Sequence, residues 1–303
     1  MPEAADRYGI AEWYGRPFLS IDPEQRTEFA LHAQQQVGTQ TPPCPFQEGE
    51  PACSKKGGVC SIQRYTRDDE GYTGGPVGEP VITCPRRFEQ DGLIIRWLAE
   101  IVGFPETEVS VAREVPFMVN RKDGKPAGKI DLVVAHEGAA GLRFHGLEIQ
   151  AVYFSGPGMA AEFSALQDAT DDRMPYPLGV RRPDWRSSGA KRLMPQLMVK
   201  APTLGRWGGA KLAVAVDQSF FSEIGGPSDT PSQDINAGDI IWLVTGLGAG
   251  PSGELTLRRH HWEMLTREDS EERLKAADPM ARDAFEKALR AKLNPLNRRQ
   301  TRR

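Results

Sequence analysis

Five apolar runs with turn-like boundaries predict the strands of a central sheet. Gly- and Pro-containing turns separate the first three runs, which suits antiparallel neighbours. The last two are apolar almost throughout, as expected for strands buried on both faces. The runs are VSVAREVPFMV at 109–119, KIDLVVA at 129–135, LRFHGLEIQAVYF at 142–154, KLAVAVDQSFF at 211–221 and DIIWLVTGL at 239–247.

Helices are predicted between these strands and on either side of them. Apolar spacing of three and four residues predicts a helix over 86–102, and a further helix is expected over 158–170. A basic helix begins near Ser188 and is interrupted near Pro195, because proline removes a backbone hydrogen bond. Residues 1–40 are partly helical, and 266–293 reads as one charged amphipathic helix. This order of elements indicates an α/β or α+β protein with a central mixed sheet flanked by helices.

Composition and charge narrow the class of protein. The chain has 303 residues, of which 39% are hydrophobic and 26% charged, enough for one large domain or one domain with a small appendage. It contains no apolar run long enough to span a membrane and no N-terminal secretory pattern, so a cytoplasmic protein is expected. The net charge of −3 counts against a purely electrostatic DNA binder, but local clusters matter more than the total.

Two acidic residues interrupt neighbouring apolar runs. If the turn between the second and third runs is centred between Ala139 and Ala140, Asp131 and Glu148 face each other across an antiparallel pair. Opposed Cβ atoms lie about 5 Å apart, so the carboxylates repel unless a cation such as Mg²⁺ lies between them. The alternative is a pair of solvent-facing acids, but an unpaired charge inside strongly apolar strands is costly.

Gln150 extends this pair into a candidate catalytic cluster. It follows Glu148 by two residues and therefore projects to the same face of a strand. Its amide oxygen can hold an attacking water, although an amide cannot act as a base. Leu147, Ile149 and Ala151 are expected to pack on the opposite face. A metal held by the two carboxylates would lower the pKa of a bound water and neutralise charge on a phosphate.

All the cysteines lie in the first third of the chain, as Cys44, Cys53, Cys60 and Cys84. The segment 41–85 is rich in Gly and Pro and shows little periodicity, so we expect it to need a clip to fold. A cytoplasmic protein does not depend on disulfides, and four thiolates suit either iron or zinc. The spacing differs from that of common zinc ribbons, and four unrelated thiols are the alternative.

A strongly basic segment, 181–211, contains one acid, Asp184. Arginine and lysine neutralise phosphates, and arginine can also read guanine in the major groove. A solvated basic face is the alternative interpretation. The basic tail 294–303 is expected to bind DNA only weakly, and the histidines at 145, 260 and 261 are interpreted as structural. The candidate DNA-contacting residues are Arg181, Arg182, Arg186, Ser187, Lys191 and Arg192.

The D-x16-E-x-Q spacing of the acidic cluster resembles the PD-(D/E)xK nucleases, in the variant with glutamine in place of lysine. The chain departs from that pattern in carrying Ile130 before the first acid, and Gln150 lacks the charge of lysine. A closer resemblance is to the NotI family of type II restriction endonucleases. It is carried by CPF at 44–46, CSKKGGVCS at 53–61, ITCPRRF at 82–88, the EIQ motif, RRPDWRSSGAKRLMPQL at 181–197 and AVAVDQSFF at 213–221.

The resemblance implies a homodimeric enzyme that cuts both strands of a palindromic site in double-stranded DNA with Mg²⁺. It implies Asp131, Glu148 and Gln150 as catalytic residues and an iron site with four cysteine ligands. A further acid is implied on the preceding strand, for which Glu114 is the best match and Glu100 the competitor.

The expected organisation is an N-terminal region at 1–90, a PD-(D/E)xK domain at 91–293 and the tail. Two alternative functions stay open: a less specific repair or defence nuclease, and a metal–thiolate DNA-binding protein without nuclease activity.

Overall fold

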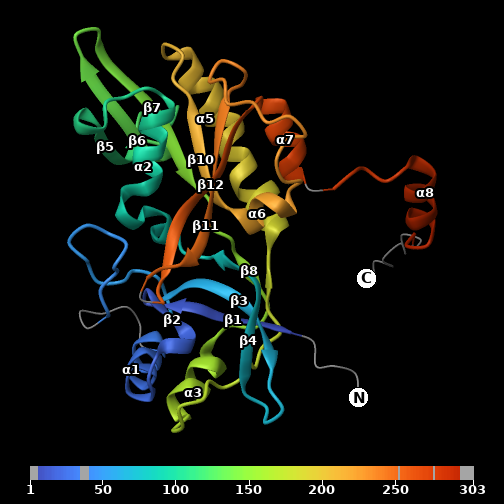
Figure 1. Cartoon of the computed structure of the whole chain (residues 1–303). Helices are drawn as coiled ribbons and strands as arrows, with labels where there is room; N and C mark the ends of the chain where they lie inside the picture. Colours follow the sequence, from blue (N-terminus) through green and yellow to red (C-terminus); the bar gives the residue numbers. More distant parts are fainter. Residues whose placement is uncertain (1–5, 35–40, 252, 276, 294–303) are drawn as a thin grey trace, which may run out of the picture.

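The computed structural model describes residues 6–34, 41–251, 253–275 and 277–293 (Figure 1). The basic tail at 294–303 lies outside these residues. Two sheets organise the chain, one of six strands and one of four. Among the helices in the described residues, none has the length and apolar character needed to cross a membrane.

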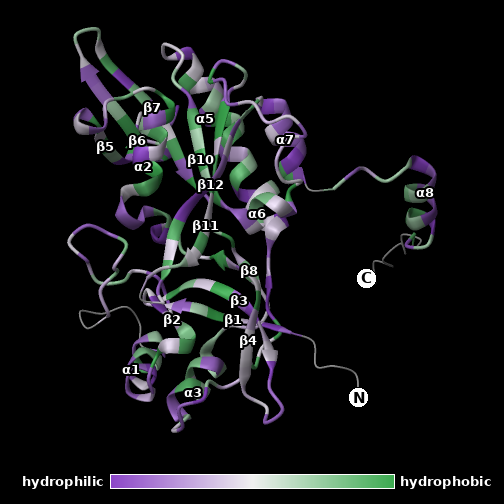
Figure 2. Ribbon diagram, viewed as in Figure 1, coloured by the Kyte–Doolittle hydropathy of each residue, from purple (hydrophilic) through white to green (hydrophobic). Residues whose placement is uncertain are grey.

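The larger sheet has the strand order β12-β11-β10-β7-β6-β5. Strands β7, β10 and β11 are parallel, whereas β5, β6 and β12 run antiparallel to their neighbours, so the predicted mixed sheet is confirmed. The strands are β5 (Ser110–Pro116), β6 (Lys129–Gly138), β7 (Gly141–Ile149), β10 (Leu212–Asp217), β11 (Ile240–Ala249) and β12 (Leu255–Leu265). Figure 2 shows that the central strands β10 and β11 are largely hydrophobic, in keeping with burial on both faces.

Each predicted apolar run contains a strand, with two differences. The run at 142–154 leaves the sheet after Ile149, and its end instead forms β8 (Phe154–Ser155), which pairs with β9 (Arg182–Pro183). Edge strand β12 lies outside the five runs, because polar residues such as Arg258, Arg259 and His260 occupy its exposed positions. An edge strand needs fewer apolar residues than a central one, so an apolar run is a poor signal for it.

Helices cover both faces of the larger sheet. On one face α2 (Leu93–Ile101) packs against residues such as Leu147 and Leu243. On the other, α5 (Met194–Arg206) packs against residues such as Val214. The predicted packing of Leu147, Ile149 and Ala151 against one face is therefore confirmed, since all three belong to or contact the α2 cluster. The remaining helices near this sheet are α4 (Trp185–Ser188), α6 (Gln218–Glu223) and α7 (Arg267–Lys275).

The expected single helix at 266–293 is wrong. The chain forms α7 and then α8 (Arg282–Arg290), which stands apart from the body in Figure 1. Pro279 lies between them, and proline disfavours a helical conformation in the residue before it. The helix is not broken at Pro195, since α5 begins at Met194 and contains this proline in its first turn, where the missing N–H is tolerated; a π-helical turn at Gly189–Leu193 precedes it and links α4 to α5.

The smaller sheet is antiparallel, with the order β2-β1-β3-β4. Its strands are β1 (Arg7–Trp13), β2 (Arg16–Pro17), β3 (Val59–Arg67) and β4 (Thr73–Ile82), and it packs with α1 (Pro23–Gln34) and α3 (Ala160–Asp168). Segment 41–85 buries Ile62, Tyr65 and Val81, although its sequence shows little periodicity, and they belong to a cluster shared with other parts of the chain. Strand β4 was not predicted because it contains several glycines and prolines. It is an edge strand, where proline is tolerated.

Buried polar contacts join the two sheets. The fully buried Arg87 guanidinium is 2.9 Å from the Glu12 carboxylate of β1 and donates to the carbonyl oxygen of Leu255 at the start of β12 (2.7 Å). Asp217, at the end of β10, accepts the backbone N–H of Ile82 at the end of β4 (3.0 Å). One continuous hydrophobic cluster also spans both sheets, so the N-terminal region and the larger sheet share a core.

Candidate active site

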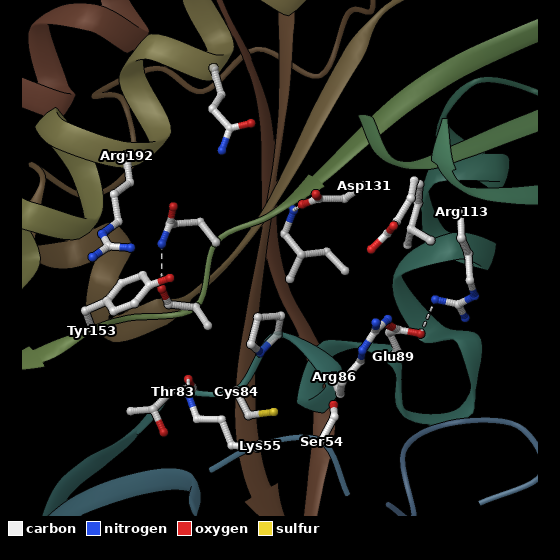
Figure 3. A pocket seen from close by; sticks show the side chains of 17 residues that line it. Ser54, Lys55, Thr83, Cys84, Arg86, Glu89, Arg113, Asp131, Tyr153 and Arg192 are labelled. Atoms are coloured by element: carbon white, nitrogen blue, oxygen red, sulfur yellow. Dashed lines mark hydrogen bonds and ion pairs between the residues drawn. The ribbon is translucent and has the colours of Figure 1, made fainter. Parts of the chain in front are cut away.

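A cleft of about 750 Å³ lies where the two sheets meet (Figure 3). Three parts of the chain form it: the loop before β3, the segment after β4, and the edge of the larger sheet with the start of α5. The lining residues are Ser54, Lys55, Thr83, Cys84, Pro85, Arg86, Glu89, Arg113, Glu114, Asp131, Leu132, Ile149, Gln150, Ala151, Tyr153, Arg192 and Gln196.

The two predicted carboxylates lie next to each other at the end of the β6–β7 ladder. The ladder runs from Gly138↔Gly141 to Leu132↔Leu147, which confirms a turn centred between residues 139 and 140. Just beyond the last pair of this ladder, each acidic side chain accepts a backbone N–H from the opposite strand. A Glu148 carboxylate oxygen accepts the N–H of Asp131 (3.3 Å), and an Asp131 oxygen accepts the N–H of Ile149 (3.0 Å). Both side chains are thus held where the strands diverge, and Asp131 lines the cleft.

Glu148 is a buried carboxylate, only 2% exposed. Burial raises its pKa to about 7, the Asp131 charge acts in the same direction, and Lys200 opposes both. The Lys200 ammonium lies 2.6 Å from Glu148 Oε1 and also donates to Gln196 Oε1 (2.5 Å). The sequence places Lys200 in an exposed-looking basic segment, but the structure buries it between α5 and the sheet.

Gln150 also reaches the cleft, although by a different route from the one predicted. Strand β7 ends at Ile149, so alternation along a strand does not extend to residue 150. The Gln150 backbone N–H donates to the carbonyl oxygen of Ala215 (3.0 Å), which keeps the chain beside β10. Its side-chain amide nitrogen donates to the carbonyl oxygen of Ala151, and the residue is 7% exposed.

The structure separates the two candidates for an additional acid. Glu114 lies between the pairs Arg113↔Leu132 and Val115↔Ile130, so it stands opposite Asp131 in the β5–β6 register and lines the cleft. Its backbone adopts a left-handed φ of +50°, which is uncommon for a residue other than glycine. A hydrogen bond from Lys129 lowers the pKa of Glu114. Glu100 instead lies on α2, where it pairs with Arg259 of β12 (2.5 Å).

The donor set at Asp131 and Glu148 is compatible with Mg²⁺. Across the described residues, no group of three or more His, Cys, Asp or Glu side chains forms a metal-binding arrangement. A magnesium site here would therefore contain two protein carboxylates, completed by phosphate oxygens and waters. Such a set suits Mg²⁺, which keeps several waters and is commonly held by one or two carboxylates with substrate phosphates.

All four cysteines are buried free thiols at one end of the smaller sheet. The N–H of Cys84 donates to the carbonyl oxygen of Cys60 (3.1 Å), and two backbone hydrogen bonds within the 42–53 loop bring Cys44 and Cys53 toward each other. Burial raises the pKa of Cys53, and the charges of Cys84 and Cys44 add to it. The thiols are close neighbours, but in this conformation their sulfurs are not arranged as a coordination set. Cys84 also lines the cleft.

The predicted DNA-contacting residues separate into buried and accessible groups. Arg181 is 4% exposed, forms an ion pair with Glu162 and donates to the carbonyl oxygen of Pro157 (3.2 Å). These contacts hold the segment before α3 and turn the Arg181 guanidinium away from solvent. The side chains of Arg182, Arg186 and Lys191 are exposed.

Arg192 and Ser187 lie in the helical part of the basic segment, in the π-helical turn and in α4. Arg192 lines the cleft, with its guanidinium 3.4 Å from the centre of the Tyr153 ring (Figure 3). The half-buried Ser187 donates its N–H to the Asp184 side chain (2.9 Å), which caps α4.

Two arginines that sequence reasoning missed face the cleft opposite Arg192. Glu89 is buried, and its two carboxylate oxygens hold Arg86 (2.7 Å) and Arg113 (2.5 Å). Both arginine side chains stay more than a third exposed, and Figure 3 shows them grouped around Glu89. Lys55, held by the Thr83 carbonyl oxygen (2.8 Å), adds a further cation. These residues come from three separate segments, so no local motif links them.

The histidines at 145, 260 and 261 make no contact with Asp131 or Glu148 among the hydrogen bonds and ion pairs of the described residues. His145 accepts the N–H of Lys211 through Nδ1 (3.0 Å), and burial lowers its pKa to about 4, so it is neutral at physiological pH. His260 is exposed on edge strand β12, and His261 lies 3.8 Å from Glu263.

A family model described as Restriction endonuclease NotI matches residues 27–256. The match includes β3 and β4 of the smaller sheet and the larger sheet from β5 to β11, and it covers the four cysteines, the carboxylate pair and the basic segment. No curated protein and no solved structure gives a significant match to the chain.

Proposed function

The chain belongs to the NotI restriction endonuclease family and is a DNA-cleaving hydrolase; from this premise we propose that it is a type II enzyme acting on palindromic sites. It would hydrolyse one phosphodiester bond in each strand with Mg²⁺ as cofactor. The observation that carries the proposal is the adjacent pair Asp131 and Glu148 at the edge of a cation-lined cleft.

Asp131 and Glu148 would hold the metal ion, in a PD-(D/E)xK type of site. When bound, Mg²⁺ would activate a water and neutralise charge that develops on the phosphate. Gln150, beside them on the cleft wall, would orient the attacking water through its amide oxygen. Attack on phosphorus would break the bond to the 3′ oxygen and leave a 5′-phosphate and a 3′-hydroxyl. Glu114, opposite Asp131 in the register, would be the additional acid of the site.

The cations of the cleft suggest the path of the DNA. Arg86 and Arg113 line one wall and Arg192 the other, so a phosphate backbone between them would lie beside the carboxylates. Arginine and lysine contacts to phosphates supply much of the affinity for DNA and position the duplex. The exposed residues Arg182, Arg186 and Lys191, with Ser187, would extend the contact, whereas Arg181 would act structurally.

The four cysteines would hold a structural iron or zinc ion. The support for this metal site is chemical. Four buried free thiols lie at the end of one sheet, in a protein that we propose to be cytoplasmic. Since their sulfurs are not arranged as a coordination set, metal binding would have to draw them together. Two strands are cut at a palindromic site, so we propose a homodimer, in which each copy would cut one strand.

The proposal is tested by DNA cleavage with purified protein. We expect discrete, Mg²⁺-dependent fragments from long unmethylated DNA and none in EDTA. Asp131→Ala should lower the cleavage rate by on the order of 10³-fold or more, because several kcal/mol of transition-state stabilisation are lost. Asp123→Ala, in an exposed turn, is the matched control. Wild-type cleavage by Asp131→Ala would contradict the assignment, and a smear in place of bands would indicate a less specific nuclease.

A further inference from the structure

A buried lysine contacts the acidic cluster from the helical layer. Lys200 lies on α5, is 3% exposed, and its ammonium is 2.6 Å from Glu148 Oε1. Gln196, one helical turn earlier, accepts a second hydrogen bond from it, and the Phe117 ring lies 5.8 Å away. Lysine is rarely buried unless it is paired, so these contacts account for its position.

The charges explain why a cation is needed at this point. Two carboxylates lie together, and Glu148 is almost fully buried, so their negative charges are poorly solvated without a nearby positive charge. In nucleases with lysine in the position of Gln150, the strand itself supplies that charge. Here residue 150 is neutral, and a helix on the same side of the sheet as Glu148 carries the ammonium instead.

The contacts also distinguish the two oxygens of Glu148. Oε1 receives both the Lys200 ammonium and the backbone N–H of Asp131 (3.3 Å). With this oxygen doubly engaged, the other oxygen, Oε2, is the one that remains for a metal ion. A carboxylate held in this way would bind metal through a single oxygen and in one orientation.

We propose that Lys200 is a positioning residue of the active site, which holds Glu148 through Oε1, supplies the fixed positive charge of the site and leaves Oε2 to Mg²⁺. The inference rests on the proposed magnesium-dependent function. A purely structural salt bridge would have the same geometry, but it would not respond to metal. The two roles therefore differ in how Mg²⁺ changes the stability of a variant without the ammonium.

Thermal unfolding of the whole chain without DNA tests the proposal. Lys200→Met keeps the length of the side chain and removes its charge. In EDTA its Tm should fall by on the order of 5 to 10 °C, because a buried carboxylate loses its partner. In MgCl2 a large part of this loss should be recovered, because Mg²⁺ replaces the missing charge. The rise in Tm on adding Mg²⁺ should thus be larger for Lys200→Met than for the wild type.

Lys211→Met is the matched control, because Lys211 is a partly buried lysine that contacts the carbonyl oxygen of Gly238 instead of an acid. Its response to Mg²⁺ should equal that of the wild type. An equal response of Lys200→Met and wild type would overturn the proposal. The assay uses no DNA, so an inactive protein can still support the role of Lys200, and an active nuclease can still contradict it.

A second comparison covers the case in which Lys200→Met fails to fold. Glu148→Gln leaves the ammonium buried without its carboxylate, whereas Glu148→Gln with Lys200→Met removes both charges. We expect the double variant to be more stable than Glu148→Gln alone and to show no rise in Tm with Mg²⁺. A double variant that is no more stable than Glu148→Gln, or one that keeps the Mg²⁺ response, would overturn the proposal.

Discussion

The two sheets contribute different charges to the cleft, because the candidate catalytic carboxylates all belong to the larger sheet, whereas the cations come from both regions. The larger sheet places Asp131, Glu114 and, behind them, Glu148 at its edge. The N-terminal region places Lys55 and Arg86 on the facing side, next to Cys84. The difference suggests a division of work in which the larger sheet performs hydrolysis and the N-terminal region helps to hold the DNA. Damage to one region should then affect cleavage and binding unequally.

The largest effect is expected from substitutions in the cysteine cluster. Cys60→Ser with Cys84→Ser should remove the proposed iron or zinc ion and unfold the N-terminal region, because metal binding contributes folding energy. DNA binding should be abolished, and cleavage should be lost as a consequence. Elemental analysis and circular dichroism measure the two effects. No cysteine lies outside the cluster, so Thr66→Ser, at an exposed position of the same strand, serves as the control. A metal-free wild type with normal DNA binding would contradict the metal site.

A moderate effect is expected when only the grip on DNA is weakened. Arg86→Ala with Arg113→Ala should lower DNA affinity about 10- to 100-fold and reduce the dependence of binding on salt, because two phosphate contacts are lost. Cleavage by enzyme saturated with DNA should change far less. Binding titrations at several salt concentrations measure this, with the exposed Arg96, paired to Glu106, replaced by Ala as the control.

The opposite result for the arginine pair would also be informative. If the double variant binds DNA normally but cleaves it slowly, these arginines act on the reacting phosphate, and the division between catalytic acids and DNA-holding cations is wrong.

The smallest expected effect concerns the contact between the sheets. Burial raises the pKa of Asp217 to about 7, while its carboxylate accepts the N–H groups of Ile82 and Phe220. An acid whose pKa is raised in the folded state stabilises the fold below its unfolded pKa of about 4, and this contribution is lost as pH rises to about 7. Asp217→Asn should therefore lose a few degrees less in Tm between pH 4 and pH 7 than the wild type.

Thermal unfolding across this pH range measures the difference, with Asp234→Asn in an exposed turn as the control. A wild type and Asp217→Asn variant with parallel pH profiles would show that this carboxyl titrates as in the unfolded chain.

The larger sheet was more predictable than the smaller one, for a physical reason. Strands such as β10 and β11 are buried on both faces, so their sequences are continuously apolar. The β6–β7 register followed from a short turn, because a hairpin turn fixes which residues face each other. The smaller sheet escaped prediction because β4 contains several glycines and prolines, which an edge strand tolerates.

The acids of the site were visible in the sequence, whereas their partners were not. Asp131 and Glu148 interrupt apolar runs, and this interruption is a local signal. Lys200 is 52 positions from Glu148 in the sequence. It belongs to a basic segment whose other cations are largely exposed. Arg86 and Arg113 are likewise brought together only by Glu89. No periodicity or spacing predicts such pairs.

The sequence by itself determined the class of fold and the hairpin that aligns the carboxylates, because these depend on local patterns of apolar residues and turns. It also determined the family, through short motifs of specific residues. Only the tertiary structure decided which cations lie at the candidate site. It buried Arg181 against Glu162 and Lys200 against Glu148, and it left Arg192 at the cleft. The physical reason is that burial and ion pairing depend on contacts between segments far apart in the chain, where a basic residue has the same local signature whether it binds DNA or an internal carboxylate.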